Sequence, residues 1–173
     1  MDTVLEILKY ILPSLVVFFT AYLSIKQLIK NERSRRNFEL VTKNKQIITP
    51  IRLQAYERLT LFLERISIEN LVMKFSKEKL SVSQLQNQLL KTIRSEFDHN
   101  VSQQIYISPQ AWEVIKSARE NTVKLINSTA QQYNPNDAAL KFSRAILEKV
   151  MSQPKTSTQV AIEYLKREVR NYF

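Results

Sequence analysis

The stretch YILPSLVVFFTAYLSIKQLIKNERSRR (Tyr10–Arg36) joins an uncharged apolar segment directly to a cluster of basic residues. From Val4 to Ile25 the only charged residues are Glu6 and Lys9. As a helix this segment would extend roughly 33 Å, enough to cross the ~30 Å hydrocarbon core of a bilayer. A surface helix of a soluble protein carries a polar stripe, and LVVFFTAYL has none. The pattern therefore predicts that residues 1–25 form a transmembrane anchor rather than a buried helix.

The residues that flank the apolar segment argue against a cleaved signal peptide. Such a peptide has a basic region before its apolar core and a small-residue cleavage site after it. Here Asp2 and Glu6 precede the core, basic residues follow it, and AYLSI is a poor cleavage site. Since basic flanks stay on the cytoplasmic side, we expect a single-pass protein with its N-terminus outside and residues 26–173 in the cytoplasm.

The basic run that follows predicts contact with the membrane surface. The chain has a net charge of +10. Residues 26–46 hold seven basic and two acidic side chains, so they carry the densest positive charge. We interpret residues 26–49 as a basic juxtamembrane stalk that sets the topology and contacts anionic lipid headgroups. Nucleic acid is the less favoured partner, because no aromatic platform accompanies the charge. The predicted membrane-surface residues are Lys26, Lys30, Arg33, Arg35 and Arg36.

The composition favours helices and excludes several kinds of functional site. The 173 residues include no Gly, which argues against β-hairpins, P-loops and Rossmann turns. They include no Cys either, which excludes disulfides, zinc knuckles and thiol nucleophiles. The predicted fold class is therefore all-α: one transmembrane helix continuing into a stalk, then a compact bundle of about five helices in residues 50–173.

Apolar spacing and cap residues predict where the bundle helices begin. We expect the stalk helix to stop at Thr49, because the residue before a proline avoids helical backbone. The first helix of the bundle would cover residues 50–75. The four later helices would begin at a capping box formed by Ser81 and Gln84, at Ser108 with Pro109, at Asn136 or Asp137, and at a capping box formed by Thr156 and Gln159. The core stripe of the first helix is Ala55, Leu59, Phe62 and Ile66, widened by Leu53, Tyr56 and Leu63. Ile105 and Ile107 would lie in a short extended connection.

The segment IRLQAYERL (Ile51–Leu59) is the first candidate for a binding face. Its charged residues lie beside apolar ones, so a partner could contact both kinds of side chain. The competing and favoured interpretation is ion pairing within the bundle. Tyr106 is expected to be more exposed than Trp112. The candidate partner face consists of Arg52, Tyr56, Arg58, Arg65 and Tyr106.

The sequence offers little for catalysis. Glu96 and His99 have the Glu-x-x-His spacing of carboxylate-bridged diiron bundles, but those sites need two such motifs and this chain has one His. A histidine at a helix C-terminus is more simply explained by the helix dipole. We predict no catalytic residues, no metal, no cofactor and no enzymatic activity.

Two motifs, TPIRLQAYERLTLFLERI (Thr49–Ile66) and IRSEFDHNVSQQIYIS (Ile93–Ser108), carry a family resemblance. The chain resembles an uncharacterised family of small single-pass membrane proteins of Bacteroidota, a domain of unknown function. The resemblance covers nearly the whole chain, including the closing AIEYLKREVRNYF (Ala161–Phe173). It implies a location in the bacterial inner membrane and implies no activity or cofactor.

These observations predict a non-catalytic, membrane-anchored interaction protein. Its partners would be other membrane proteins or further copies of itself, and anionic lipid headgroups. It would serve as an accessory or scaffold subunit of an inner-membrane assembly. The alternative is an electrostatic adaptor whose basic stalk and bundle bind anionic lipid or hold RNA or ribosomes at the membrane surface.

Overall fold

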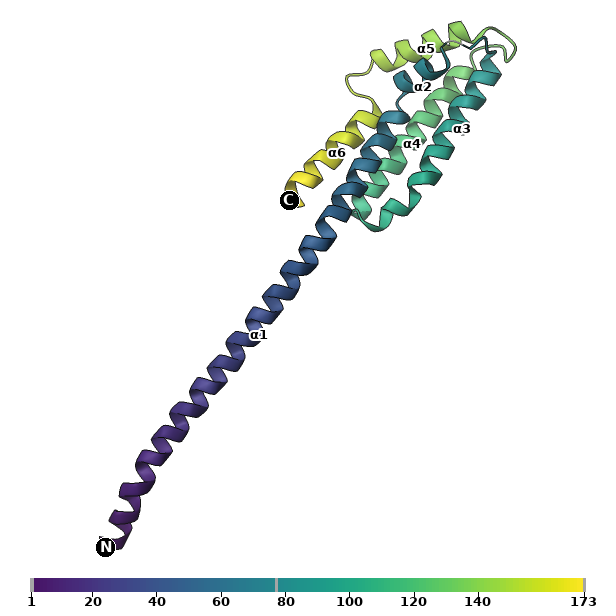
Figure 1. The fold of residues 1–173 in the computed structure, drawn as a ribbon. Helices are drawn as coiled ribbons and strands as arrows, with labels where there is room; N and C mark the ends of the chain where they lie inside the picture. Colours follow the sequence, from purple (N-terminus) through teal and green to yellow (C-terminus); the bar gives the residue numbers. More distant parts are fainter. Residues whose placement is uncertain (1, 77, 173) are drawn as a thin grey trace. The chain divides into compact units, whose positions relative to one another are not determined.

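In the part of the chain that the structure describes, every named element is a helix. The computed structural model describes residues 2–76 and 78–172, with the side chains of 2–14, 34, 37–38, 40–41, 44–45 and 172 left out. These residues form six α-helices, a short 3₁₀ helix and an isolated β-bridge, without a named strand (Figure 1). The elements are α1 (Asp2–Arg65), α2 (Ile68–Phe75), α3 (Val82–Asn100), η1 (Val101–Ile105), α4 (Pro109–Ala130), α5 (Ala139–Met151) and α6 (Ser157–Tyr172). The predicted all-α class is confirmed.

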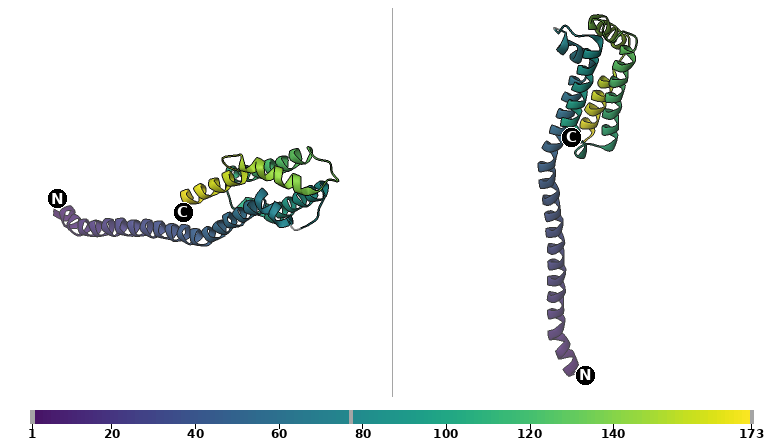
Figure 2. Two further views of the ribbon diagram at one scale, coloured as in Figure 1. Left: turned by 90° about the horizontal axis from the view of Figure 1, so that it is seen from above. Right: turned by 90° about the vertical axis from the view of Figure 1, so that its right-hand side faces the viewer.

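The chain divides into two compact units. The first is Met1–Thr49 and the second is Pro50–Phe173. Within the second unit, α4 packs against both α3 and α6, and α5 crosses one end of α3 and α4 and packs against α2 (Figures 1 and 2).

Pro50 does not end the first helix, so the prediction that the stalk helix stops at Thr49 is wrong. Helical backbone runs through Thr49 and Pro50 to Arg65. A proline inside a helix removes one hydrogen bond and costs about 3 kcal/mol. The carbonyl that loses its partner belongs to Gln46, which is exposed, so water can satisfy it.

The predicted helix over residues 50–75 is instead two helices with a break at Ile66 and Ser67. Ser67 has an extended backbone, with φ −60° and ψ 141°. The Glu64 carbonyl, near the end of α1, accepts hydrogen bonds from Ser67 Oγ and Asn70 Nδ2, both at 2.8 Å. The break lets Ile66 and Ile68 both lie in the core. In one straight helix, residues two apart lie about 200° apart and would not share a face.

Three of the predicted helix starts are confirmed by their cap hydrogen bonds. The capping box at Ser81 and Gln84 is complete, and Ser108 Oγ accepts from the amide of Ala111 with Pro109 at the first helical position. Thr156 and Gln159 exchange both bonds of the second capping box. These caps are local, which is why the sequence predicts them.

Two predicted connections are wrong. Residues 101–105 form the 3₁₀ helix η1 rather than an extended segment. The predicted helix start at Asn136 or Asp137 corresponds to α5, which has Ala138 at its N-cap. No side chain caps this helix, so neither Asn136 nor Asp137 fills that role. The backbone there pairs with the start of α3: Ala139 N donates to Leu80 O at 3.0 Å, and Val82 N donates to Asp137 O at 2.9 Å.

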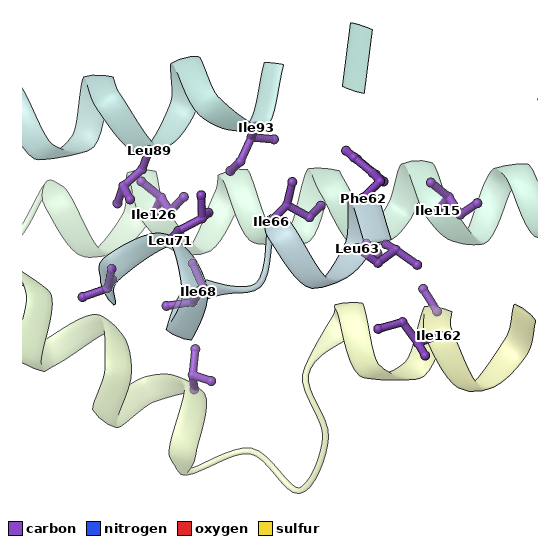
Figure 3. Packing of buried hydrophobic residues seen from close by; sticks show 14 of the residues in the cluster. Phe62, Leu63, Ile66, Ile68, Leu71, Leu89, Ile93, Ile115, Ile126 and Ile162 are labelled. Atoms are coloured by element: carbon purple, nitrogen blue, oxygen red, sulfur yellow. The ribbon is translucent and has the colours of Figure 1, made fainter. Parts of the chain in front are cut away.

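The core forms where the apolar stripes of the bundle helices meet (Figure 3). The predicted stripe of α1 is confirmed, since Ala55, Leu59, Phe62 and Ile66 are each at most 1% exposed. Leu53 is not part of it and is 40% exposed. Trp112 packs at the edge of the core, where its ring stacks on Phe97 with 5.5 Å between centroids.

Removing one buried side chain from this stripe will test the core. Leu59 is 0% exposed, so Leu59→Ala should lower the free energy of unfolding by about 2–5 kcal/mol through lost burial and a cavity. Leu61, on the same helix, is 48% exposed, and Leu61→Ala should cost less than about 1 kcal/mol. Denaturant unfolding of the full chain followed by circular dichroism measures both; equal losses would contradict this packing.

Candidate functional site

In the first unit, α1 exposes apolar side chains on all sides between Leu15 and Ile25. Val17, Phe18 and Phe19 are 66%, 67% and 59% exposed. Three successive helix residues are spread over about 200° of its circumference, so a single neighbouring helix could not cover all of them. An exposed apolar surface of this kind marks a site of contact with a membrane or with another protein.

The predicted membrane span is not tested over its full length. Across the described residues, no helix has an apolar stretch of the length and hydropathy needed to cross a membrane. The side chains of residues 4–14, half of the predicted segment Val4–Ile25, lie outside the described ones. The anchor therefore stays a prediction.

The five predicted membrane-surface residues fall into two groups. Lys26, Lys30 and Arg33 line one hollow on α1, together with apolar side chains of the same helix. Arg35 and Arg36 instead form ion pairs one turn away along the helix, with Glu39 at 3.1 Å and with Glu32 at 3.3 Å. Exposed pairs of this kind contribute only about 0.3–0.5 kcal/mol, but they balance the charge locally.

In the second unit, the candidate partner face divides between the core and the surface. Tyr56 is 3% exposed, and its hydroxyl donates to Glu168 Oε1 of α6 at 2.9 Å. Arg52, one turn earlier on α1, donates from Nε to the carbonyl oxygen of Tyr106 at 3.0 Å. Tyr56 therefore holds two helices together and is not available for a partner.

Glu168 is the residue of this cluster that the sequence interpretation missed. It is 8% exposed, and its Oε2 is buried without a hydrogen-bond partner among the described atoms. Its position was detectable in principle, because Glu168 follows Ala161 and Leu165 along the apolar stripe of α6. A charged residue in such a stripe indicates a buried polar contact.

Burial raises the pKa of Tyr56 to about 12, with a further contribution from the hydrogen bond and negative charge of Glu168. Arg52 lowers the pKa of Tyr56, through a hydrogen bond and through its positive charge. The folded protein thus stabilises the neutral phenol of Tyr56, whose hydroxyl donates a hydrogen bond to Glu168.

The remaining residues of the candidate face lie at the surface. Arg65 forms an ion pair with Glu96 of α3 at 3.1 Å, as the favoured interpretation of intramolecular pairing predicts. Arg58 is exposed, and Tyr106 is 38% exposed. Whether this surface binds a partner stays a prediction.

Both residues of the Glu-x-x-His motif make contacts with other protein groups. Glu96 pairs with Arg65, and His99 Nδ1 lies 2.7 Å from the carbonyl oxygen of Ser95. In the described part of the chain, no three or more His, Cys, Asp or Glu side chains are grouped as metal ligands would be.

The bundle also carries an apolar groove of about 1050 Å³ between α2, α3 and α5, which we call the α2–α5 groove. It was not predicted from the sequence. Leu140 and Met151 on its α5 side are 72% and 82% exposed. Charges of both signs line it, with Glu78 and Lys79 before α3, and Arg144 and Glu148 on α5.

Comparison with known proteins identifies the family. The sequence profile of DUF7935, described as a family of unknown function, matches residues 2–172. The chain belongs to this family. No curated protein and no solved structure matches it. The predicted resemblance to a family of unknown function is confirmed, whereas the membrane location and the origin in Bacteroidota stay predictions.

The Tyr56–Glu168 pair should make stability fall at alkaline pH. Because the folded pKa of Tyr56, about 12, lies above the ordinary value of 10.0, the folded state binds more protons between these values. This contribution to stability is fully present below pH 10 and is lost as pH rises through 12. The difference in unfolding free energy between wild type and Tyr56→Phe should therefore shrink over this range.

Below pH 10, Tyr56→Phe should cost about 1–3 kcal/mol, because it leaves a buried carboxylate without its donor. Tyr106→Phe, which removes a more exposed hydroxyl, is the control. Denaturant titrations of all three proteins at several pH values give both results; a wild-type to Tyr56→Phe difference that stays constant up to pH 12 would refute the assignment.

Proposed function

We propose that the protein is a non-catalytic, single-pass membrane protein whose helical bundle binds another protein of the membrane. It would serve there as an accessory or scaffold subunit of an inner-membrane assembly. The observation that carries the proposal is the helix between Leu15 and Ile25, whose apolar side chains are exposed on all sides.

A bilayer accounts for this exposure better than a partner helix does. Coiled coils and bundles bury a stripe of each helix and leave the remaining surface polar. Around Val17, Phe18 and Phe19 there is no charged side chain, and the hydroxyl of the nearby Thr20 is bonded to the carbonyl oxygens of Val16 and Val17. The apolar sequence also continues towards the N-terminus to Val4, which gives the length that a span needs.

The charge distribution supports one orientation. Seven basic residues lie between positions 26 and 46, whereas residues 1–25 contain one. Basic flanks remain on the cytoplasmic side. The bundle would therefore be cytoplasmic and the N-terminus would lie outside.

The α2–α5 groove supports the role in protein binding. Its apolar lining and exposed Met151 match the sites that receive the apolar face of an amphipathic helix. Because Lys79 and Arg144 line it together with Glu78 and Glu148, a helix with charges of both signs beside its apolar stripe would complement it. We propose that such a helix of the partner protein occupies the groove.

The anchor can be tested with charges placed inside it. Wild-type protein expressed in a bacterium should stay in the membrane pellet after an alkaline carbonate wash. Each Lys at the centre of a span costs about 2.5–3.5 kcal/mol, so Val17→Lys with Phe19→Lys should move the protein to the supernatant. Leu61→Lys, at an exposed position of the bundle, is the control and should stay in the pellet. Wild type in the supernatant would refute the anchor.

The groove can be tested by comparing two exposed methionines. Met151 lines the groove and is 82% exposed, whereas Met73 is 72% exposed and does not line it. If a partner helix occupies the groove, Met151→Glu should reduce a stoichiometric partner at least tenfold in pull-downs from mild detergent. Met73→Glu should leave it unchanged. Equal recovery with both variants would exclude the groove, and recovery of no partner from wild-type membranes would refute the binding function.

A further inference from the structure

The hollow on α1 combines positive charge with apolar surface on one face of the helix. It is lined by Tyr22, Ile25, Lys26, Ile29, Lys30 and Arg33. Residues three and four apart share a helix face, which explains the grouping. The Lys26 ammonium lies 6.0 Å from the centre of the Tyr22 ring, within reach of a cation–π contact.

The cations of this face differ from the other basic residues of the stalk. Lys26, Lys30 and Arg33 have no carboxylate partner among the described side chains, and they give the face a charge of +3. Arg35 and Arg36 are each balanced by a glutamate. A binding site for an anion is therefore expected at the first three residues.

We infer that this face, lined by Tyr22, Lys26, Lys30 and Arg33, binds the phosphate headgroup of an anionic phospholipid, whose acyl chains lie along the apolar helix. The inference rests on the proposed membrane anchor and adds a lipid preference and the residues that produce it. Ammonium and guanidinium groups are suited to a phosphodiester, and Arg33 can bind two of its oxygens at once.

Lipid fits this face better than a nucleic acid does. The segment from Lys26 to Arg33 extends roughly 10 Å along the helix axis. One headgroup layer is ~5–8 Å deep, and a long basic side chain can reach towards it from either end of the segment, so all three cations can contact the same layer. Tyr22 marks the boundary between this region and the apolar residues before it, where interfacial aromatic residues lie. Ile25 and Ile29 add apolar contacts that suit an acyl chain.

The sequence allows a control that keeps both charge and composition. Exchanging Lys26 with Gln27 and Lys30 with Asn31 gives the variant K26Q/Q27K/K30N/N31K. Each charge moves by one residue, about 100° around the helix, and by only about 1.5 Å in depth. Net charge and apolar sequence stay the same, so the variant changes which face is basic. The second control, R35Q/R36Q, removes two charges that are already paired.

The experiment is lipid retention by the full-length protein. Wild type and variants are reconstituted in vesicles of equal phosphatidylglycerol and phosphatidylcholine and then extracted in mild detergent, and the bound lipids are counted by native mass spectrometry. Wild type should retain phosphatidylglycerol over phosphatidylcholine by at least about fivefold, the effect of one basic residue near anionic headgroups. The exchange variant keeps its charges at nearly the same depth but no longer on one face, so its ratio should fall at least about threefold below that of wild type. The R35Q/R36Q variant should stay within twofold of wild type.

Three outcomes would overturn the lipid face: an exchange variant with the wild-type ratio, an R35Q/R36Q variant that loses as much as the exchange variant, or a wild type without preference. Binding of single-stranded RNA that the exchange variant alone loses, without any lipid preference in wild type, would likewise overturn it in favour of a nucleic-acid site.

A carbonate wash of the same vesicles distinguishes failure of the lipid face from failure of the proposed anchor. If wild type is washed off, the proposed anchor fails, whereas retained protein without lipid preference rejects the lipid face alone.

Discussion

Burial of one stripe of α1 is the interaction on which the rest of the bundle depends. Leu59, Phe62 and Ile66 are all but completely buried, and α2, α3, α4 and α6 contribute side chains to the same core. Burying each large apolar side chain contributes about 1.5–3 kcal/mol, whereas a typical hydrogen bond contributes about 0.5–1.5 kcal/mol.

One polar contact is placed inside this apolar core. Tyr56 and Glu168 connect α1 to the last helix, and Arg52 lies close enough to affect the pKa of Tyr56. Leaving this buried carboxylate without its donor would cost about 1–3 kcal/mol, so the pair favours one position of α6 over others. The same contact removes Tyr56 from the candidate partner face and leaves Arg58 and Tyr106 exposed.

The two units present different kinds of surface. In the first, α1 exposes apolar side chains from Leu15 to Ile25, and then a face on which Lys26, Lys30 and Arg33 lie beside isoleucines. In the second, the α2–α5 groove is apolar and lined by charges of both signs. The first surface suits lipid and the second suits a protein helix, which is why a membrane-anchored binding protein is the function proposed for this member of the DUF7935 family.

The sequence by itself determined the helical class and three helix starts. Caps such as Ser81 with Gln84 depend on side chains three residues from the backbone groups they bind, so local sequence is sufficient. Only the tertiary structure decided the features that join distant segments. Tyr56 and Glu168 are 112 residues apart, and the start of α5 is satisfied by backbone near Leu80 rather than by its own side chains. The candidate site was predicted only in part for the same reason: exposure and pairing depend on which helix packs against each residue, and periodicity within one helix does not determine that.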